Sequence, residues 1–299
     1  MKAAPFAYVR PTRLGDVVAE LVRADEDGGG KVIAGGQSLV PVLAMRLGRP
    51  STLVDITDVD ELKQVDLIDG SLRVGAAVRQ RRVERDFRGV VPLLSQALPW
   101  VGHREIRSRG TVCGSLAHAD PAAEMPAVAS CLGATLEVTG PGGARRIAAE
   151  KFFSGAMTTC LGPTEVVTAV RIPLPRQGDG FGFAELARRH GDFAVAGVAV
   201  RVRTRGGTVE EAAVTAFGVS DRPRYRDLRD ELQGAVERAG VDAIGIAREL
   251  GDAVTAMADQ IVTTAGDSHG SSQYRRRVLR ALATRELVHA YQSSLEPPR

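Results

Sequence analysis

The most informative stretch of this chain for its fold is TVCGSLAHADPAAEMP at residues 111–126. A second stretch of the same character, IAGGQSL, occupies residues 33–39. Each combines small residues with a hydroxyl group close to an expected helix start. Glycine allows backbone conformations that aim successive N–H groups at one point, and it leaves room for close approach to the backbone. Either stretch alone is typical of an ordinary capped turn, but together they predict two loops that close on one phosphate-bearing ligand.

The two loops have complementary donors. The first follows a segment at 31–33 that is typical of a strand, and Ser38 stands where the N-cap of the next helix is expected. A helix start offers unsatisfied N–H groups and the positive end of the helix dipole, which suits a diphosphate. In the second loop, Thr111 and Ser115 add hydroxyl donors beside Gly114. The motifs GxxxxGK[ST] and GxGxxG are absent from the sequence, which excludes a P-loop and the usual Rossmann fingerprint.

Three polar side chains in the second stretch, His118, Asp120 and Glu124, raise the alternative of acid–base or metal chemistry. The pair Asp120-Pro121 is typical of a helix N-cap followed by proline at the first helical position, and Glu124 would then lie in the first turn. His118 lacks a second ligand at helical spacing, so a structural histidine is favoured. Asp55 ends an expected strand and is also interpreted as a cap. We predict no catalytic residue and no metal site in this chain.

The composition sets the class of protein. The 299 residues, 44% of them apolar, suffice for two or three packed units, and the formal charge of +3 is small. Arginine clusters such as 79–85 are accompanied by acidic residues, so we interpret them as solvated helix faces. The aromatic fraction of 4% argues against stacking on single-stranded nucleic acid. Three cysteines without a CxxC pair indicate a reducing compartment and no zinc or iron–sulfur site. With no apolar leader and no long apolar run, we expect a cytoplasmic protein without a transmembrane segment.

Hydrophobic periodicity predicts an α+β fold. Strands are expected at 31–33, 52–56, 64–67, 71–74, 135–138, 144–147, 165–172, 183–187, 198–202 and 209–219. Helices are expected at 14–23 (capped by Thr12), 78–86, 92–99, 121–132, 224–238, 241–258 and 273–291. The segment PLPRQGDG at 173–180 is the best linker candidate, because it combines proline, glycine and polar residues.

Four motifs in order identify a family: AGGQSLVP (34–41), IRSRGTVCGSLAHADPAAEMPA (106–127), RRHGDFAVAGVAV (188–200) and YRRRVLRALATREL (274–287). The chain resembles, over nearly its whole length, the FAD-binding medium subunit of molybdenum hydroxylases. This family includes aerobic carbon monoxide dehydrogenase, nicotine dehydrogenase and the flavin part of xanthine dehydrogenase. The resemblance implies a two-subdomain FAD-binding domain of the vanillyl-alcohol oxidase (PCMH) type and a C-terminal domain of antiparallel sheet and helices. The implied boundaries are 1–176, with subdomains of about 1–57 and 58–176, and 177–299.

The resemblance also implies an FAD site in which both loops hold the pyrophosphate. Glu124 matches the family's acidic residue that binds the adenosine part, Val167 lies on the strand that reaches the flavin ring, and Phe193 belongs to an element that approaches the ring. The implied cofactor-binding residues are Ile33, Ala34, Gly35, Gly36, Gln37, Ser38, Leu39, Thr111, Cys113, Gly114, Ser115, Glu124, Val167 and Phe193. Cys113 departs from the family's usual Gly-Gly. Its Cβ restricts the backbone, so we expect FAD binding with slightly changed geometry.

By the same resemblance, the substrate reacts at a molybdopterin cofactor in a large partner subunit. Electrons then pass through [2Fe–2S] clusters of a small partner subunit to the FAD in this chain, and from there to an external acceptor. A dimer of heterotrimers is the implied assembly. Two alternatives stay open: a stand-alone flavin oxidoreductase of the same fold, for which no acid or base can be nominated, and a flavin-free assembly subunit, for which Cys113 is the only indication.

Overall fold

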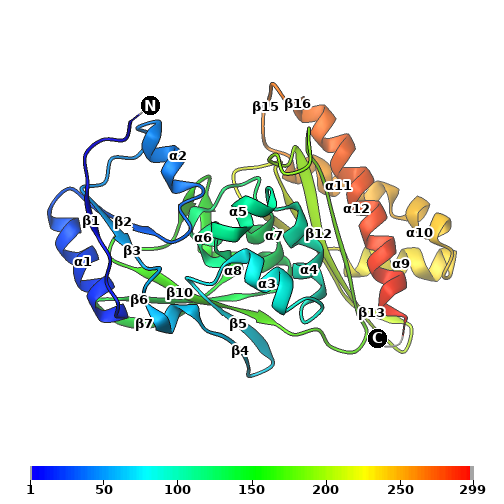
Figure 1. The fold of residues 1–299 in the computed structure, drawn as a ribbon. Helices are drawn as coiled ribbons and strands as arrows, with labels where there is room; N and C mark the ends of the chain where they lie inside the picture. The colour runs from blue at the N-terminus through cyan, green and yellow to red at the C-terminus, as the bar shows by residue number, and fades with distance from the viewer. Residues whose placement is uncertain (1, 297–299) are drawn as a thin grey trace. The chain divides into compact units, whose positions relative to one another are not determined.

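The computed structural model describes residues 2–296, which form two compact units (Figure 1). The first unit comprises the chain up to residue 88 together with 103–119 and 133–173, and the second comprises 89–102, 120–132 and the chain from 174 onward. Two segments of the N-terminal region, 89–102 and 120–132, thus pack with the C-terminal part. They do so because they carry helices that cover its sheet.

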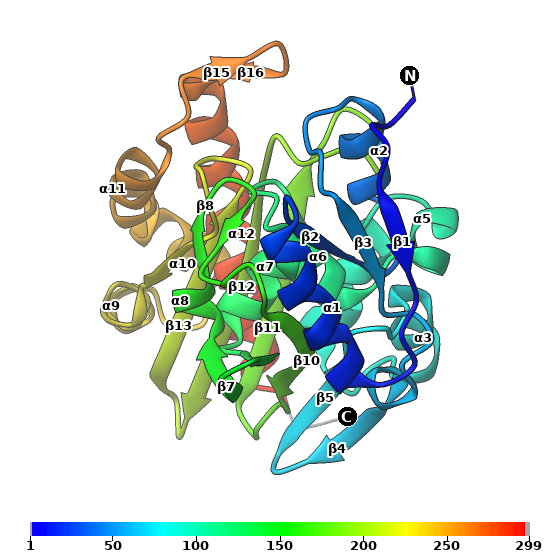
Figure 2. The same ribbon diagram turned by 90° about the vertical axis from the view of Figure 1, so that its left-hand side faces the viewer.

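A three-stranded parallel sheet carries the first glycine loop. Its strands, in spatial order, are β1 (Ala7–Val9), β3 (Thr52–Asp55) and β2 (Gly30–Ile33). Helix α1 (Leu14–Glu26) buries Val17 and Leu21 and lies beside β2 and β3 (Figure 2), while α2 (Leu39–Ala44) links β2 to β3. Ile33 and Asp55 are register partners at the carboxyl ends of β2 and β3. This end of a parallel sheet is where ligands usually bind, so the sheet presents the loop at 33–39 at a suitable edge.

An antiparallel sheet of five strands completes the first unit, in the order β4-β5-β10-β6-β7. Its strands are β4 (Val65–Ile68), β5 (Ser71–Gly75), β6 (Thr135–Gly140), β7 (Gly143–Ala148) and β10 (Val166–Pro173). Asp69 and Gly70 join β4 to β5 with φ of 51° and 67°, as a type I′ hairpin turn requires. Glu137 on β6 accepts hydrogen bonds from Arg73 and Arg171 and so joins the three central strands. The remaining elements of this unit are a 3₁₀ helix (Asp60–Lys63), α3 (Gln80–Asp86), α5 (Arg104–Arg109), α6 (Val112–His118), α8 (Ala149–Phe152), β8 (Phe153–Gly155) and β9 (Thr158–Thr159).

The second unit is a four-stranded antiparallel sheet between two layers of helices. The strands, in spatial order, are β11 (Asp179–Leu186), β12 (Ala196–Arg205), β13 (Thr208–Phe217) and β14 (Arg224–Asp227). On one face lie α9 (Arg229–Ala239), α10 (Ala243–Glu249), α11 (Gly251–Ile261) and α12 (Ser272–Ser294). On the other lie α4 (Pro92–Ala97) and α7 (Glu124–Cys131). Alternate residues of β12, Val198, Val200 and Val202, are fully buried against the first layer, as the period of a strand requires. A 3₁₀ helix (Leu98–Trp100) and the short strands β15 (Gly266–Asp267) and β16 (Gly270–Ser271) complete the unit.

The predicted α+β fold is confirmed, as are both hairpins of the first unit and the C-terminal antiparallel sheet. Four local predictions are wrong. Arg13, not Thr12, is the N-cap of α1. The helix predicted from 121 begins only at Glu124. Residues 224–227 are a strand because they pair with β13, and the helix predicted at 241–258 is interrupted between α10 and α11.

Candidate functional site

The loop at 33–39 leaves β2 through a glycine turn. Gly36 has a φ of 73°, a left-handed conformation that L side chains rarely adopt. Ser38 occupies the N-cap position of α2, as predicted, but its hydroxyl makes no cap hydrogen bond. It is exposed. Its hydroxyl is therefore available to a ligand.

The first loop lies directly against the segment that leads into the second. A methyl group on Gly35 would lie 2.3 Å from the carbonyl oxygen of Arg109 and 2.7 Å from Cα of Gly110. Arg79 pairs with Thr111 through an isolated antiparallel bridge, and the N–H of Gln80 donates to the carbonyl of Gly110 at 2.8 Å. The structure thus sets the first loop against the segment that leads into the second, and glycine at 35 allows this contact. Arg109 lines the cavity described below, whereas Thr111, Cys113, Gly114 and Ser115 are not among its lining residues.

An ion pair between a buried arginine and a partly buried glutamate fixes the segment before Thr111. Nε and Nη2 of Arg107 on α5 donate to the two carboxylate oxygens of Glu84 on α3, at 3.0 and 3.1 Å. Burial by itself would raise the pKa of Glu84, but the hydrogen bonds from Arg107 and Arg81 hold it below its ordinary value. The forked geometry of a guanidinium on a carboxylate restricts both partners. Arg107 therefore holds α5 and the following loop against α3.

The second loop begins helix α6. The Thr111 hydroxyl accepts a hydrogen bond from the N–H of Gly114 at 2.9 Å and so caps the helix. The hydroxyl predicted as a ligand donor is therefore also a helix cap, and the Gly114 N–H is already satisfied. Cys113 points away from the loop into the core, where its thiol contacts the carbonyl oxygen of Val74 at 3.5 Å. A side chain at this position is thus accommodated on the core side of the helix.

A cavity of about 730 Å³ opens beside the first loop and includes Ile33 to Gln37 among its lining residues. This volume is within the usual range for small-molecule sites. Asp55 is the one carboxylate in its described lining. It accepts hydrogen bonds from the Tyr8 hydroxyl and, at 2.8 Å, from the N–H of Thr57. Burial alone would raise the pKa of Asp55, but these hydrogen bonds keep it below its ordinary value. The second bond is the strand-end cap that the sequence predicts.

Two arginines that the sequence analysis missed also line this cavity. They are Arg79 and Arg109, and neither has an ion-pair partner among residues 2–296. The Arg79 guanidinium is half-buried and donates a hydrogen bond to the carbonyl oxygen of Arg109. Burial, and then the charge of Arg109, lower the pKa of Arg79. Arg79 belongs to the cluster at 79–85 that the sequence analysis assigned to a solvated face. Its place just before a helix that follows a strand was the one signal that it could face a site.

These features suit FAD. The cavity lining includes the glycine turn and two guanidinium groups without ion-pair partners, and the exposed Ser38 hydroxyl follows that lining in sequence; together they offer donors and positive charge to a diphosphate. Two like charges brought together at a half-buried site are unfavourable until an anion joins them. The residues present therefore fit the diphosphate part of the cofactor.

Val167 is buried near the start of β10. The pairing of β10 with β6 shifts register between Val167 and Ala169, which marks a β-bulge. Bulges are common beside functional sites, where they re-aim side chains. Helix α6 packs on β10, so the strand that carries Val167 and the helix of the second loop are neighbours.

Glu124 and Phe193 belong to the second unit. Glu124 is the first residue of α7 and is buried, in the first turn as predicted. Asp120 is not the helix cap. Its carboxylate accepts a hydrogen bond from the N–H of Ala122 at 2.8 Å in a local turn, because the helix begins later than predicted. Phe193, in the segment between β11 and β12, is 71% exposed. Such an exposed aromatic ring adds nothing to the core of this unit.

Glu185 on β11 is an unexpected buried acid in the second unit. Both of its carboxylate oxygens are buried and have no hydrogen-bond partner within the described part of the chain. Burial, and then the charge of Glu124, raise the pKa of Glu185 to about 8. Its carboxyl group is therefore mostly protonated at neutral pH.

Residues 2–296 lack two kinds of feature. No group of three or more histidine, cysteine, aspartate or glutamate side chains is placed to hold a metal ion. No helix in this range has the length and apolar character needed to cross a membrane.

Comparison with known proteins identifies the family. Residues 4–175 match the FAD binding domain in molybdopterin dehydrogenase, and residues 181–290 match the CO dehydrogenase flavoprotein C-terminal domain. The caffeine dehydrogenase subunit beta of Pseudomonas sp. is 36% identical, over 97% of this chain and 96% of that protein. The carbon monoxide dehydrogenase medium chain of Afipia carboxidovorans is 33% identical, over 95% of this chain and 96% of that protein. A chain of quinoline 2-oxidoreductase from Pseudomonas putida 86 superposes with a TM-score of 0.88 at 35% identity, over 99% of this chain and 100% of that one.

These matches extend along nearly the whole chain and include both units of the fold. They also agree with the site, where a glycine-lined cavity carries the charge that a diphosphate needs. The chain belongs to the family of FAD-binding medium subunits of molybdenum hydroxylases.

Proposed function

We propose that this chain holds FAD with its diphosphate between residues 33–39 and 109–115, and passes electrons within a molybdopterin-dependent dehydrogenase complex. Bound FAD accepts electrons one at a time or in pairs, which suits it to join single-electron carriers to a two-electron acceptor. The observation that carries the proposal is the contact of Gly35 with Arg109 at a cavity that two unpaired guanidinium groups line.

Each part of the site has a separate task. Gly35 lets the first loop approach Arg109, Gly36 allows the left-handed turn, and the Ser38 hydroxyl, which caps no helix, adds a donor. Arg79 and Arg109 supply charge that the backbone cannot. Thr111 shapes the second loop by capping α6, while Gly114 and Ser115 line that helix start.

The remaining assignments rest on the resemblance to the family. We assign Glu124 to the adenosine part of the cofactor, and Val167 and Phe193 to the surroundings of the flavin ring. The domain division at 176/177 belongs to the same proposal.

The assembly is also part of the proposal. The relatives are named as the subunit beta of a dehydrogenase and as the medium chain of carbon monoxide dehydrogenase. By this likeness we assign to the chain a large molybdopterin-binding partner and a small [2Fe–2S] partner, in a cytoplasmic dimer of heterotrimers. The molybdenum chemistry on the substrate then takes place outside this chain.

Ligand titration of the flavin-free protein tests the site. Wild type should bind FAD and also ADP, because the diphosphate is part of both. Arg79→Gln should remove a charge-assisted hydrogen bond worth about 1.5–3 kcal/mol and so weaken ADP binding roughly 10- to 150-fold. Adenosine has no phosphate, so its binding should be the same in both proteins.

Arg88→Gln is the matched control. Arg88 follows α3, is exposed and lies outside the lining of the cavity, yet its replacement removes the same charge. If Arg79→Gln and Arg88→Gln bind ADP alike, the assignment of Arg79 is wrong. Folded wild type that takes up no FAD would contradict the flavin function itself and favour an assembly subunit.

A further inference from the structure

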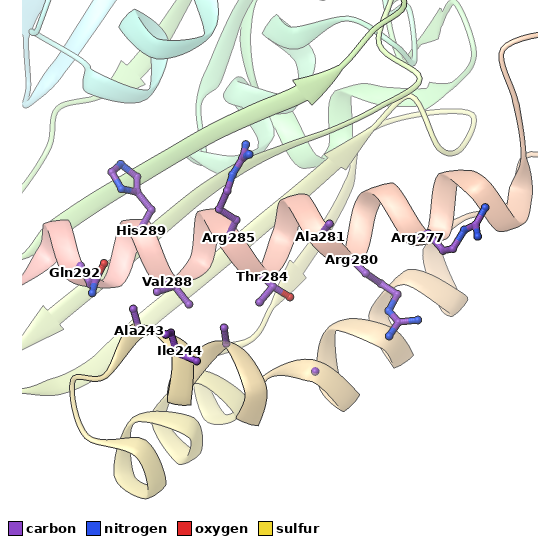
Figure 3. A pocket seen from close by; sticks show the side chains of 12 residues that line it. Ala243, Ile244, Arg277, Arg280, Ala281, Thr284, Arg285, Val288, His289 and Gln292 are labelled. Carbon is purple, nitrogen blue, oxygen red and sulfur yellow. The ribbon is translucent and has the colours of Figure 1, made fainter.

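A groove of about 860 Å³ runs along α12 beside α10 and the start of α11 in the second unit (Figure 3). Thr284, Val288 and Gln292 are spaced one helical turn apart, and Figure 3 shows them on the side of α12 that faces α10. From Arg277 to Gln292 the groove follows α12 for roughly 22 Å, at 1.5 Å per residue. A segment of about four helical turns has this length.

The floor of the groove is apolar and is open to solvent. Ile244 on α10 is 80% exposed although its neighbour Ile246 is completely buried. Small side chains, Ala243, Ala247 and Ala281, keep the groove open between the helices. Isolated exposed apolar residues are ordinary, but an isoleucine within a concave apolar surface is typical of a recognition site. Ile244 is therefore the natural anchor for a second apolar group.

The rim of the groove is basic. Arg277 and Arg280 line it, and neither has an ion-pair partner in the described chain. A third arginine, Arg285, is paired with Glu286 at 2.8 Å. None of the described lining residues is an aspartate or glutamate. Uncompensated charge beside an apolar floor favours a ligand that brings both carboxylates and apolar side chains.

A second copy of the chain does not suit this groove. A two-fold interface places the same patch on both partners, so it would set the arginines of one rim close to those of the other. No lining carboxylate is present to balance them. The charge pattern instead favours a different chain that carries acidic residues.

We propose that this groove, between α10 and α12, docks an acidic amphipathic helix from another subunit of the same complex. The apolar face of that helix lies on Ile244 and Val288, and its carboxylates pair with Arg277 and Arg280. This mode of binding is the usual one for a helix in an apolar groove. The inference rests on the proposed function, because it needs a complex in which this chain is one subunit.

The test uses the FAD-loaded full chain and a co-produced complex of its large and small partner subunits. Binding is measured by titration calorimetry for wild type, Ile244→Glu and the double variant R277E/R280E. Each change should weaken binding about 10- to 100-fold, because it sets carboxylates against carboxylates or buries a charge on the groove floor. Val241→Glu and Arg248→Glu are the matched controls, because both residues are exposed, lie next to or on α10, and are absent from the groove lining. They should bind like wild type.

The outcomes separate the two proposals. If wild type and the groove variants bind the partner subunits equally well, the groove is not the docking site, while the proposed function stands. If FAD-loaded wild type does not bind those subunits at all, the proposed assembly fails and the docking proposal fails with it.

A photo-crosslinking residue in place of Thr284 locates the partner. A crosslink to an acidic segment of the large or small subunit supports the proposal. A crosslink to a second copy of this chain, or binding to anionic lipid vesicles that R277E/R280E abolishes while subunit binding is unchanged, would overturn it.

Discussion

Gly35→Ala tests whether the contact between the two loops is as close as the structure shows. The added methyl carbon would lie 2.3 Å from the carbonyl oxygen of Arg109, whereas ordinary contacts begin near 3.4 Å. The loops would therefore have to separate by about 1 Å. The atoms in the way belong to the backbone, so no side chain can rotate to relieve the clash.

Overpacking of this kind costs about 1–3 kcal/mol. If the folded chain bears that cost, its melting temperature should fall by about 2–4 °C for each kcal/mol. If the loops instead move apart without loss of stability, the same free-energy cost weakens cofactor binding, and the dissociation constant of FAD should rise by roughly 5- to 150-fold. Both quantities are measurable on the same preparation, by thermal unfolding and by titrating the flavin-free protein with FAD.

Gly48→Ala is the control for this experiment. A methyl group there meets only the side chain of Val42, at 3.5 Å, so the variant should behave like wild type. The reasoning would be refuted if Gly35→Ala kept both the melting temperature and the FAD affinity of wild type. Such a result would mean that the two loops do not touch in solution.

Three further predictions follow from buried groups and from the second loop. Burial raises the pKa of Cys113 and Cys131 to about 12, whereas Cys160 is exposed. One thiol per native chain should therefore react with a thiol reagent near pH 8, and three should react after denaturation. Rapid reaction of all three thiols in the folded protein would contradict the burial of Cys113 and Cys131. Burial and Glu124 raise the pKa of Glu185 from 4.5 to about 8, so the folded chain keeps a proton that the unfolded chain releases, and stability falls as pH rises between these values. Glu185→Gln should therefore raise the melting temperature at about pH 8.5 and change it little near pH 5. The free energy of unfolding that wild type loses between these pKa values is at most about 1.4 kcal/mol per pH unit. Equal effects of the substitution at both pH values would show that the pKa of Glu185 is not raised. Gly114→Asp should reduce FAD retention more than the isosteric Gly114→Asn. Both substitutions place a Cβ 2.7 Å from the Thr111 hydroxyl oxygen, but only aspartate adds a negative charge that repels the diphosphate. Equal flavin content in the two variants would show that the diphosphate does not lie near Gly114.

Local sequence chemistry was sufficient for much of the fold. The turn at Asp69-Gly70 has the residues that a tight hairpin needs, and the structure places both in the left-handed region. Residues 224–227 show where such reasoning ends. Their charged sequence is compatible with a helix, and only pairing with β13, which lies elsewhere in the chain, makes them a strand.

The candidate site was predictable only in part, for a similar reason. The glycine loops are local signals, and the contact of Gly35 with Arg109 supports joining them. Apart from its position at the start of a helix, Arg79 carries no local signal that separates it from Arg82 or Arg85, which lie in the same basic cluster. Its role depends on the bridge to Thr111, a contact between distant parts of the sequence.

The division of the chain into units determines which truncated fragments can fold. Six segments alternate, three in each unit, so the polypeptide passes from one unit to the other five times. A fragment that ended near residue 176 would retain α4 and α7 but lose the sheet on which they lie, and would expose residues such as Leu93 and Val128 that are now buried. The two matching family segments are consecutive in sequence, yet neither coincides with one of the two compact units. We therefore expect the FAD-binding half to be made soluble only as part of the whole polypeptide, and a ribosome must finish β11–β13 before α4 and α7 find their partners.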